Sequence, residues 1–444
     1  MGRTLQHPAR LVPLAFLAAT LVGTGLLMLP VSRAGPGSAP LLTALFTATS
    51  ATCVTGLAVV DTATYWSGFG EVVLLVLVQI GGLGIVAMAT LLGLLVSRRL
   101  GLRSRLMAQA ETRTVALGEV RTMLARIGVV LIAIELAVSA VLAGRFWIAY
   151  DYPLGKAAWY GLFHGVNAVN DAGFALYPDS LIRFVGDWWI CLPIALAVIV
   201  GGLGFPVLFE LVREVRRPAL WSVHTRITVQ GSAVLLAVGF VGVLAFEWAN
   251  PRTFGPLGVP DKLLAGLFQA VIPRTAGYQT IDYASANLET IGLTNALMFI
   301  GGGSASTAGG IKVTTFFLLA YVIWSEVKGE ADVVVAHRRI SEASQRQALT
   351  VALLGVAVVA VGTLALIAVT DGLRFDQVLF EAMSAFSTTG LSMNVTPGLP
   401  APAQVVIVIL MYVGRVGTIT AASALALSER RRLYRYPEER PIVG

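Results

Sequence analysis

The chain has 444 residues, of which 56% are hydrophobic and 13% are charged. Soluble domains carry about 25% charged residues, and a soluble fold of this length could not bury so much apolar surface. Composition therefore excludes an ordinary soluble protein and favours a membrane protein. The formal net charge is +7, but the basic residues gather in particular loops, which indicates membrane topology rather than nucleic-acid binding.

Apolar runs of membrane-spanning length recur along the chain. Clear examples are 11–30, 72–96, 188–212 and 404–427, each close to the ~20 residues that a spanning helix needs. Shorter apolar segments lie between such runs, at 40–51, 155–169, 261–272 and 375–386. They are too short to span a bilayer, so they predict re-entrant half-helices.

A short glycine signature follows each predicted half-helix. In each signature a glycine follows a small residue and precedes a large apolar one. The four are Thr52-Cys53-Val54-Thr55-Gly56-Leu57, Asn170-Asp171-Ala172-Gly173-Phe174, Arg274-Thr275-Ala276-Gly277-Tyr278 and Ser387-Thr388-Thr389-Gly390-Leu391. One such signature alone is uninformative, whereas four copies behind four half-helices indicate an internal repeat.

The second spanning run of each repeat carries a further glycine mark, 24 to 28 residues after the signature glycine. The marks begin at Gly81, Gly201, Gly301 and Gly414. Close helix packing through small residues explains any one mark, but not the matching register of all four. We therefore predict an all-α membrane protein of four parallel helix–P-loop–helix repeats around a pseudo-fourfold central pore, at 11–97, 123–212, 226–324 and 345–428.

Most of the 32 Lys and Arg residues lie at the termini or between these repeats. The positive-inside rule therefore predicts that both termini are cytoplasmic. Each repeat crosses the membrane twice and ends on the side where it began. All four then share one orientation, unlike the inverted repeats of many carriers.

The signatures have the chemistry of a cation filter. An ion in the membrane must exchange its water for other oxygens, and backbone carbonyls of extended loops supply them. Glycine permits the required backbone angles, and half-helices entering from outside direct partial negative charge at the pore. The predicted filter residues are Val54, Thr55, Gly56, Asp171, Ala172, Gly173, Thr275, Ala276, Gly277, Thr388, Thr389 and Gly390.

Polar residues near the signatures have two readings. Asp61, Asp179 and Asp282, with Asn394 in the fourth repeat, form either an outer vestibule that concentrates cations or ordinary solvated loop charge. Asn170 and Arg274 are expected to hold the filter loops by hydrogen bonds rather than to contact the ion.

The third repeat contains an interrupted apolar stretch at 291–324. A continuous helix of that length would measure about 50 Å, against a hydrocarbon core of ~30 Å. The glycine-rich segment 301–310 is either a flexible linker or an intramembrane loop. The flanking pieces are too short to span separately, which favours the loop. Lys312 beside it faces either the pore or the interface, and Arg415 within the last apolar run is expected to be functional.

The four signatures, in order, resemble the filter loops of the Trk/Ktr/HKT superfamily of potassium transporters, and the resemblance covers nearly the whole chain. Because the first repeat begins directly at the N-terminal end, the chain is most similar to the bacterial Ktr membrane subunit. The resemblance implies that Gly56, Gly173, Gly277 and Gly390 are the filter glycines. Members with serine at the first position tend to pass sodium, so Gly56 implies a preference for potassium.

The resemblance also implies a gate, partners and a location. The gate lies in the loop 301–314 and involves Gly301, Gly302, Gly303, Ser304, Gly309, Gly310, Lys312 and Arg415. The implied assembly is a homodimer on a cytosolic ring of nucleotide-binding regulatory subunits, in the bacterial inner (plasma) membrane. The basic loops 97–126 and 213–226 contact either this ring or anionic lipid.

The transported ion implied is K⁺, with Na⁺ as an activator or a coupled ion, and no cofactor is expected on the chain. Whether transport is passive or sodium-coupled is left open by the sequence. The alternatives are a secondary carrier for another solute and a sodium-selective transporter of the same fold. An enzyme is disfavoured, because the sequence contains no Gly-x-Ser-x-Gly elbow and no His/Cys cluster with metal-ligand spacing.

Overall fold

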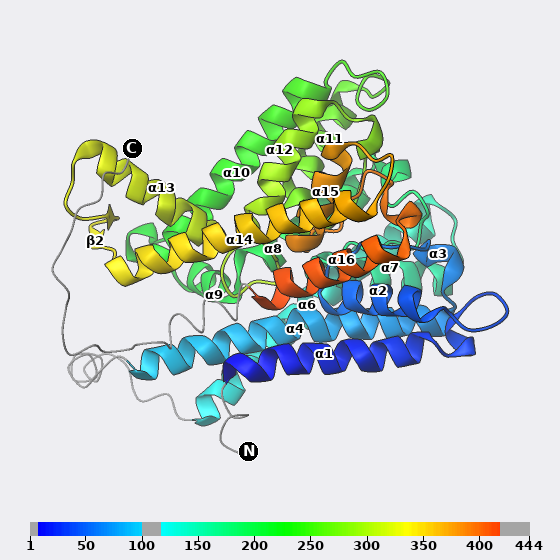
Figure 1. Ribbon diagram of the computed structural model, residues 1–444, viewed down its shortest axis with the longest axis horizontal. Coiled ribbons are helices and arrows are strands. Elements are labelled where there is room, and N and C mark those ends of the chain that lie inside the picture. Colours follow the sequence, from blue (N-terminus) through cyan, green and yellow to red (C-terminus); the bar gives the residue numbers. More distant parts are fainter. Residues whose placement is uncertain (1–7, 100–116, 418–444) are drawn as a thin grey trace.

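The computed structural model describes residues 8–99 and 117–417 (Figure 1). Two predicted features therefore lie outside the described residues: most of the basic loop 97–126, and the end of the fourth repeat at 418–428. The described chain is almost entirely helical, which confirms the predicted all-α fold. Its strands are a two-residue pair, β1 (Val334–Val335) and β2 (Arg338–Arg339), between the third and fourth predicted repeats.

The helices follow one another in a recurring order of long helix, half-helix and second helix. The first half of the chain contains α1 (Pro8–Leu27), α2 (Leu41–Thr52), α3 (Thr62–Tyr65), α4 (Gly68–Arg99), α6 (Leu117–Ala149), α7 (Leu154–Val169), α8 (Trp188–Leu203) and α9 (Phe205–Glu214). The second half contains α10 (Val223–Glu247), α11 (Val259–Val271), α12 (Leu288–Phe299), α13 (Val313–Lys328), α14 (Glu342–Val369), α15 (Phe375–Phe386), α16 (Ala401–Tyr412) and a π-helical turn (Val413–Gly417).

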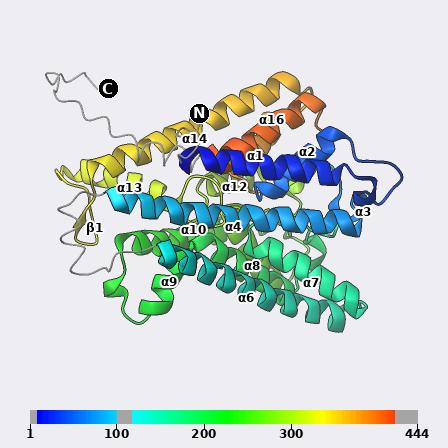
Figure 2. The ribbon, with the colours of Figure 1, turned by 90° about the horizontal axis from the view of Figure 1, so that it is seen from below.

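The half-helices are α2, α7, α11 and α15, at the four positions that the short apolar segments predict. Two of them are preceded directly by proline: Pro40 stands before α2 and Pro153 before α7. Proline cannot donate a backbone hydrogen bond, so it suits the start of a helix. Each half-helix packs against the long helix that precedes it (Figures 1 and 2).

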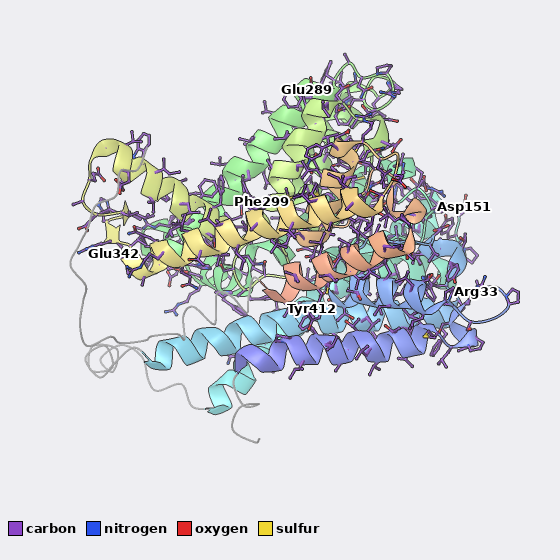
Figure 3. The ribbon with its side chains drawn as sticks, in the orientation of Figure 1. Arg33, Asp151, Glu289, Phe299, Glu342 and Tyr412 are labelled. Atoms are coloured by element: carbon purple, nitrogen blue, oxygen red, sulfur yellow. The ribbon has the colours of Figure 1, made fainter. Side chains whose placement is uncertain are left out.

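Several helices are long and apolar enough to cross a membrane. Among the described residues, three pass this test singly: Ala125–Ala149, Val223–Glu247 and Glu342–Val369. The helix α4 is 32 residues long, well above the ~20 that a crossing needs. Arg33 and Asp151 lie at the end of the molecule opposite Glu342 (Figure 3). The loops that contain Arg33 and Asp151 thus lie at one end of the helices and Glu342 at the other.

The prediction of one continuous spanning run at 188–212 is wrong. The chain breaks at Gly204, and α8 and α9 meet at an angle of 101°. Gly204 has a φ of 93°, and a Cβ placed there would strike the Ser304 carbonyl oxygen. The amide of Phe205 donates to the Ala305 carbonyl at 3.3 Å. The glycine-rich segment of the third repeat thus occupies the space that a straight helix would need.

That segment is itself a break in helix, as the length argument requires. The helix α12 ends at Phe299, which Figure 3 labels, and α13 begins at Val313. The amide of Gly301 donates to Ile311 O at 2.9 Å, and the amide of Val313 donates to Gly302 O at 3.0 Å. These bonds fold the segment between α12 and α13 into a compact loop, which we call the inner loop (residues 300–312).

Candidate functional site

The four signature loops meet and form a closed ring. A Cβ added at Gly56 would lie within 3.0 Å of the Ala172 carbonyl oxygen of the second loop. The same relation holds between each remaining glycine and the next loop in chain order: Gly173 with Ala276 O, Gly277 with Thr389 O, and Gly390 with Thr55 O. The last contact returns to the first loop, so each glycine allows its neighbour's backbone to approach.

The four loops share one backbone conformation. The residue two positions before each glycine has a positive φ, namely 56° at Val54, 59° at Asp171, 93° at Thr275 and 49° at Thr388. The glycines also have positive φ, from 69° to 90°. A non-glycine residue rarely adopts such angles, so four occurrences at matching positions mark one repeated loop design.

Hydrogen bonds to the half-helices fix the direction of these loops. The residue before each glycine donates its backbone N–H to a carbonyl of the half-helix or, in the third repeat, of the residue directly after it. The N···O distances are 2.7 Å for Thr55 to Ser50, 2.8 Å for Ala172 to Asn167, 3.0 Å for Ala276 to Ile272 and 2.8 Å for Thr389 to Ser384. The carbonyl oxygens of these same residues, Thr55, Ala172, Ala276 and Thr389, are the ones directed at the neighbouring glycines.

The glycine marks of the second helices have a related role. A Cβ at Gly81, Gly201 or Gly414 would clash with the carbonyl oxygen of Thr52, Val169 or Phe386, respectively. Each of these three carbonyls belongs to the last residue of a half-helix. The third repeat differs, because Gly301 packs against Gly309 O of the inner loop. In the first, second and fourth repeats the mark therefore lets the second helix pack closely against the end of the half-helix, where the signature loop begins.

Asn170 is held from behind by neighbouring helices. Its amide Nδ2 donates to the Glu135 carboxylate at 2.8 Å, to Val166 O at 3.0 Å and to Gln79 Oε1 at 3.1 Å. Glu135, which is 4% exposed, was missed by sequence reasoning. An acidic residue in the middle of the apolar run that forms α6 was the available signal.

Arg274 also bonds to a helix behind the ring. Its guanidinium Nη2 donates to Ser232 Oγ of α10 at 2.9 Å. The side chain is 7% exposed. The printed bonds of Asn170 and Arg274 thus go to helices behind the loops, and they tie these two loop residues to α4, α6, α7 and α10 rather than bonding to the loop backbone itself.

The inner loop contacts the signature loops at the residues that stand two positions before the glycines. Thr307 Oγ1 donates to Asp171 Oδ2 at 3.0 Å, and the Gly309 amide donates to Thr275 Oγ1 at 3.3 Å. A Cβ at Gly309 would strike the Thr388 hydroxyl. The inner loop therefore lies directly against the second, third and fourth signature loops.

Two basic side chains hold the inner loop. Arg415, which is 1% exposed, donates from Nη1 to the Thr307 carbonyl oxygen. Lys312 Nζ donates to Ala308 O at 2.6 Å, and the Lys312 side chain is half-buried. Ser304 Oγ lies 2.9 Å from Thr314 Oγ1. The predicted set Gly301, Gly302, Gly303, Ser304, Gly309, Gly310, Lys312 and Arg415 is thus brought together in and around one loop.

The opposite side of the ring opens into a cavity of about 300 Å³. All four signature glycines line it, together with Asp61, Asn394 and Ser392. Asp61 also caps α3 by accepting from the Ala63 amide at 3.0 Å. We call this cavity the outer vestibule.

The other two predicted vestibule acids have local partners. Asp179 pairs with Arg183 at 2.6 Å, and this hydrogen-bonded carboxylate raises the pKa of Arg183. Asp282 accepts from Asn394 Nδ2 at 2.9 Å and from Ser285 Oγ at 2.9 Å. Asp61 is the predicted acid that lines the cavity, whereas Asp179 and Asp282 are not among its lining residues.

A tripeptide shared by the half-helices was also missed by sequence reasoning. Each half-helix contains Leu-Phe followed by a polar residue: Leu45-Phe46-Thr47, Leu162-Phe163-His164, Leu267-Phe268-Gln269 and Leu379-Phe380-Glu381. The four phenylalanines are at most 1% exposed. The repeated tripeptide was visible in the sequence and marks the same depth in every half-helix.

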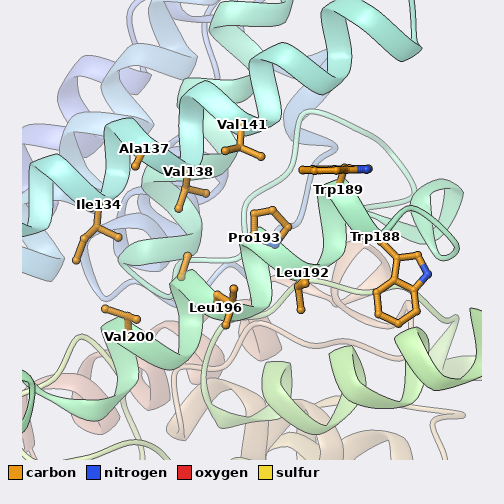
Figure 4. Close-up of a pocket in the computed structure, with 11 residues that line it drawn as sticks. Ile134, Ala137, Val138, Val141, Trp188, Trp189, Leu192, Pro193, Leu196 and Val200 are labelled. Atoms are coloured by element: carbon orange, nitrogen blue, oxygen red, sulfur yellow. The ribbon is translucent and has the colours of Figure 1, made fainter. Parts of the chain in front are cut away.

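A larger hollow of about 590 Å³ lies away from the ring, between α6 and α8 (Figure 4). Its lining includes Ile134, Val138, Leu196 and the exposed Trp188 and Trp189. These side chains offer no oxygen ligands, so this hollow lacks the chemistry to replace the water of a cation. An apolar groove on the outside of a membrane protein suits hydrocarbon instead.

Comparisons with known proteins agree with this geometry. A family model described as a cation transport protein, TrkH, matches residues 6–433. The Ktr system potassium uptake protein B of Bacillus subtilis is 39% identical over 437 residues, which cover 98% of this chain and 97% of that protein. The potassium/sodium uptake protein NtpJ of Enterococcus hirae is 32% identical over 449 residues, covering 100% of this chain and 98% of that protein.

A solved structure shares the fold. The potassium transporter TrkH from Vibrio parahaemolyticus superposes with a TM-score of 0.73 at 19% identity, covering 94% of this chain and 84% of that one. The family match spans nearly the whole chain and includes all four signature loops. The chain therefore belongs to the TrkH family of cation transport proteins.

Proposed function

We propose that this chain is the ion-translocating subunit of a potassium uptake system. In this proposal four repeats, at 11–97, 123–212, 226–324 and 345–428, surround one pore. Dehydrated K⁺ passes through the ring of signature loops and is coordinated by backbone carbonyl oxygens. The names of the relatives described above, which take up potassium, support the choice of ion.

The closed ring of glycine–carbonyl contacts carries the proposal. Four carbonyl oxygens from four equivalent loops, those of Thr55, Ala172, Ala276 and Thr389, each approach the glycine of a neighbouring loop, which supports one ring of ligands. Such rings replace the hydration shell of an alkali ion in cation filters. An organic solute carrier usually has paired or inverted repeats around a midplane site, whereas these four loops repeat in one orientation.

Oxygens without partners near the ring also favour a cation. Among the described residues, the buried hydroxyls of Thr55, Thr388 and Thr389 and the Oδ1 atom of Asp171 have no hydrogen-bond partner. A buried acceptor that lacks a donor costs about 1–3 kcal/mol. A cation in the pore would satisfy the lone pairs of these oxygens, and the Asp171 side chain favours a cation over an anion.

We propose that the inner loop is the gate. It lies against the inner side of the ring and is held by Thr307, Lys312 and Arg415. In this position it obstructs the route from the filter to the cytosol. Opening requires that these bonds break and that the loop withdraws.

The remaining parts of the proposal concern assembly and location. We propose a homodimer in the bacterial plasma membrane with cytoplasmic termini, bound to a cytosolic ring of nucleotide-binding regulatory subunits. The basic loop 213–226 offers a surface on that side, for the ring or for anionic lipid. The proposal assigns Na⁺ the role of activator or coupled ion, in line with the sodium named for the Enterococcus hirae relative.

The filter assignment is tested by flux through the purified protein in liposomes. Uptake of ⁸⁶Rb⁺ and ²²Na⁺ is compared for the wild-type chain and for Gly56→Ser. An added side chain at position 56 would press on Ala172 O and would require a φ of 90°, so we expect a lower Rb⁺/Na⁺ ratio. Gly292→Ser is the matched control, because nothing lies within 4 Å of a Cβ there.

Each outcome of this assay has a distinct meaning. A wild-type protein that transports Rb⁺ in preference to Na⁺, with the ratio reduced in Gly56→Ser alone, supports the proposal. Wild-type transport of Na⁺ in preference to Rb⁺ identifies a sodium transporter of the same fold. An unchanged ratio in Gly56→Ser contradicts the filter assignment. A repeat with an imposed sodium gradient distinguishes passive from coupled transport.

A further inference from the structure

The polar residue of the Leu-Phe-X tripeptide occupies the same place in each half-helix, but its bonds differ among the four. His164, Gln269 and Glu381 are 0%, 0% and 1% exposed, and Thr47 is 1% exposed. Three of these side chains reach forward to the segment that follows the signature glycine. Burial of a polar group is costly unless it is hydrogen-bonded. The hydrogen bonds of these side chains therefore contribute to the stability of the segments that they hold.

Glu381 makes the most extensive contacts. Its carboxylate accepts from Ser392 Oγ, from the Met393 amide at 3.3 Å and from Thr396 Oγ1 at 2.8 Å. Ser392 and Met393 follow the signature glycine Gly390 by two and three residues. Ser392 and Thr396 also line the outer vestibule. One buried carboxylate thus fixes the outward path of the fourth loop.

Gln269 and His164 make equivalent contacts in the third and second loops. Gln269 Nε2 donates to Thr280 Oγ1 at 2.9 Å, and Tyr283 Oη donates to Gln269 Oε1 at 2.6 Å. The Leu176 amide donates to His164 Nε2 at 3.3 Å. Thr280 and Leu176 each stand three residues after a signature glycine. The same spacing in both loops argues for a common purpose.

The anchored segments are also linked to one another. Tyr278 Oη donates to the His164 carbonyl at 3.1 Å, which joins the third loop to the second half-helix. Gln279 Nε2 donates to Ser392 O at 2.9 Å, which joins the third loop to the fourth. A displacement at one anchor is therefore passed to the next loop in the ring.

Thr47 is the exception and provides a natural comparison. The hydrogen bond that the structure gives its hydroxyl goes to Thr43 O, one turn earlier in the same helix, at 2.8 Å. A hydroxyl is too short to reach across to a neighbouring loop and prefers such local bonds in a helix. The first loop consequently has no anchor of this kind among the described residues.

We infer that His164, Gln269 and Glu381 are positioning residues that set the width of the outer end of the filter, and with it the selectivity for the cation. They hold the second, third and fourth loops from the half-helix side. The inference rests on the proposed function of the ring as a cation filter. Its physical reason is that discrimination between alkali ions depends on the placement and stiffness of the coordinating carbonyls.

The test compares shape-matched pairs of variants in the liposome assay. Glu381→Leu removes every acceptor, whereas Glu381→Gln keeps one acceptor for Ser392 and Met393 and a donor for the Thr396 hydroxyl. Gln269→Leu and Gln269→Glu form a second pair of the same design. Thr47→Val is the matched control, because the Thr47 hydroxyl bonds within its own helix. The readouts are the Rb⁺/Na⁺ uptake ratio and the amount of folded protein in the membrane.

We expect Glu381→Leu, which removes three hydrogen bonds, to lower the Rb⁺/Na⁺ ratio about tenfold, and Gln269→Leu, which removes two neutral ones, to lower it about fivefold. Glu381→Gln, Gln269→Glu and Thr47→Val should stay within about twofold of the wild type. An unchanged ratio in both leucine variants, with folded protein present, overturns the inference while leaving the filter in place. If a leucine variant does not fold, Ser392→Ala replaces it, and an unchanged ratio there has the same consequence. A wild-type chain without Rb⁺ uptake contradicts the proposed function instead.

Discussion

The Thr307 hydroxyl donates to the Asp171 carboxylate at 3.0 Å, which joins the inner loop of the third repeat to the signature loop of the second. Both side chains are fully buried. The Thr307 carbonyl oxygen accepts in turn from Arg415 of the π-helical turn. One threonine thus connects three of the four repeats, directly beneath the ring. Any movement of the inner loop away from the ring must break both bonds.

The first prediction concerns this threonine. Thr307→Val keeps the side-chain shape and removes the donor to Asp171, so the closed position of the inner loop loses a hydrogen bond of about 0.5–1.5 kcal/mol. We expect uptake of Rb⁺ to rise about fivefold, because the closed position of the inner loop is then less favoured. Thr363→Val is the matched control, since the Thr363 hydroxyl bonds to Val359 O within α14. Equal uptake by Thr307→Val and the wild type would show that this bond does not restrain the gate.

The second prediction concerns the length of the inner loop. Deleting residues within 301–310 removes the part that lies against Thr275 and Thr388. If this segment is the barrier to flux, its shortening raises uptake of Rb⁺ without changing the Rb⁺/Na⁺ ratio. The measurement is the initial uptake rate per folded protein in liposomes. A folded deletion variant with the wild-type rate would remove the gate from the proposal.

The third prediction concerns the close contact between Gly414 and the last residue of α15. A Cβ at position 414 would overlap the Phe386 carbonyl oxygen, and such overpacking costs about 1–3 kcal/mol. We expect Gly414→Ala to lower the unfolding temperature in detergent and to reduce uptake. Gly292→Ala, where space is open, should leave the unfolding temperature unchanged or slightly raise it. Similar temperatures for both variants would mean that the helix is free to shift at Gly414.

The fourth prediction concerns Glu135, which accepts from Asn170 and from Gln79 Nε2 at 2.8 Å and 3.0 Å. Glu135→Leu leaves both amides with one acceptor fewer, and each unsatisfied group costs about 1–3 kcal/mol. We expect a lower unfolding temperature and a reduced Rb⁺/Na⁺ ratio. Glu135→Gln retains an oxygen for Asn170 and should recover most of both. If the two variants behave alike, the acceptor role assigned to Glu135 is wrong.

Much of the fold follows from local sequence patterns. The predicted half-helix 375–386 coincides with α15, and 40–51 differs from α2 by one residue at each end. Short apolar segments flanked by proline or glycine have few other ways to satisfy their backbone in a membrane. The fourfold repeat could also be predicted from the sequence, because the recurrence of the four signatures is visible without a structure.

The parts that could not be predicted depend on contacts between distant segments. The break at Gly204 exists because Ser304 and Ala305 of another repeat occupy the space beside it. The sequence around Gly204 otherwise reads as one apolar helix. The hydrogen-bond partner of Lys312 could not be predicted either, because its bond to Ala308 O depends on how the inner loop folds back. The Leu-Phe-X anchors required knowledge of which loop faces each half-helix.

The central claim is that carbonyl oxygens from four equivalent loops surround one dehydrated alkali ion. The most direct measurement is an anomalous diffraction map of crystals grown in Rb⁺. The account predicts a peak on the axis of the ring, coordinated by the carbonyls of Thr55, Ala172, Ala276 and Thr389. A map with strong Rb⁺ peaks elsewhere in the protein and none within this ring would contradict it.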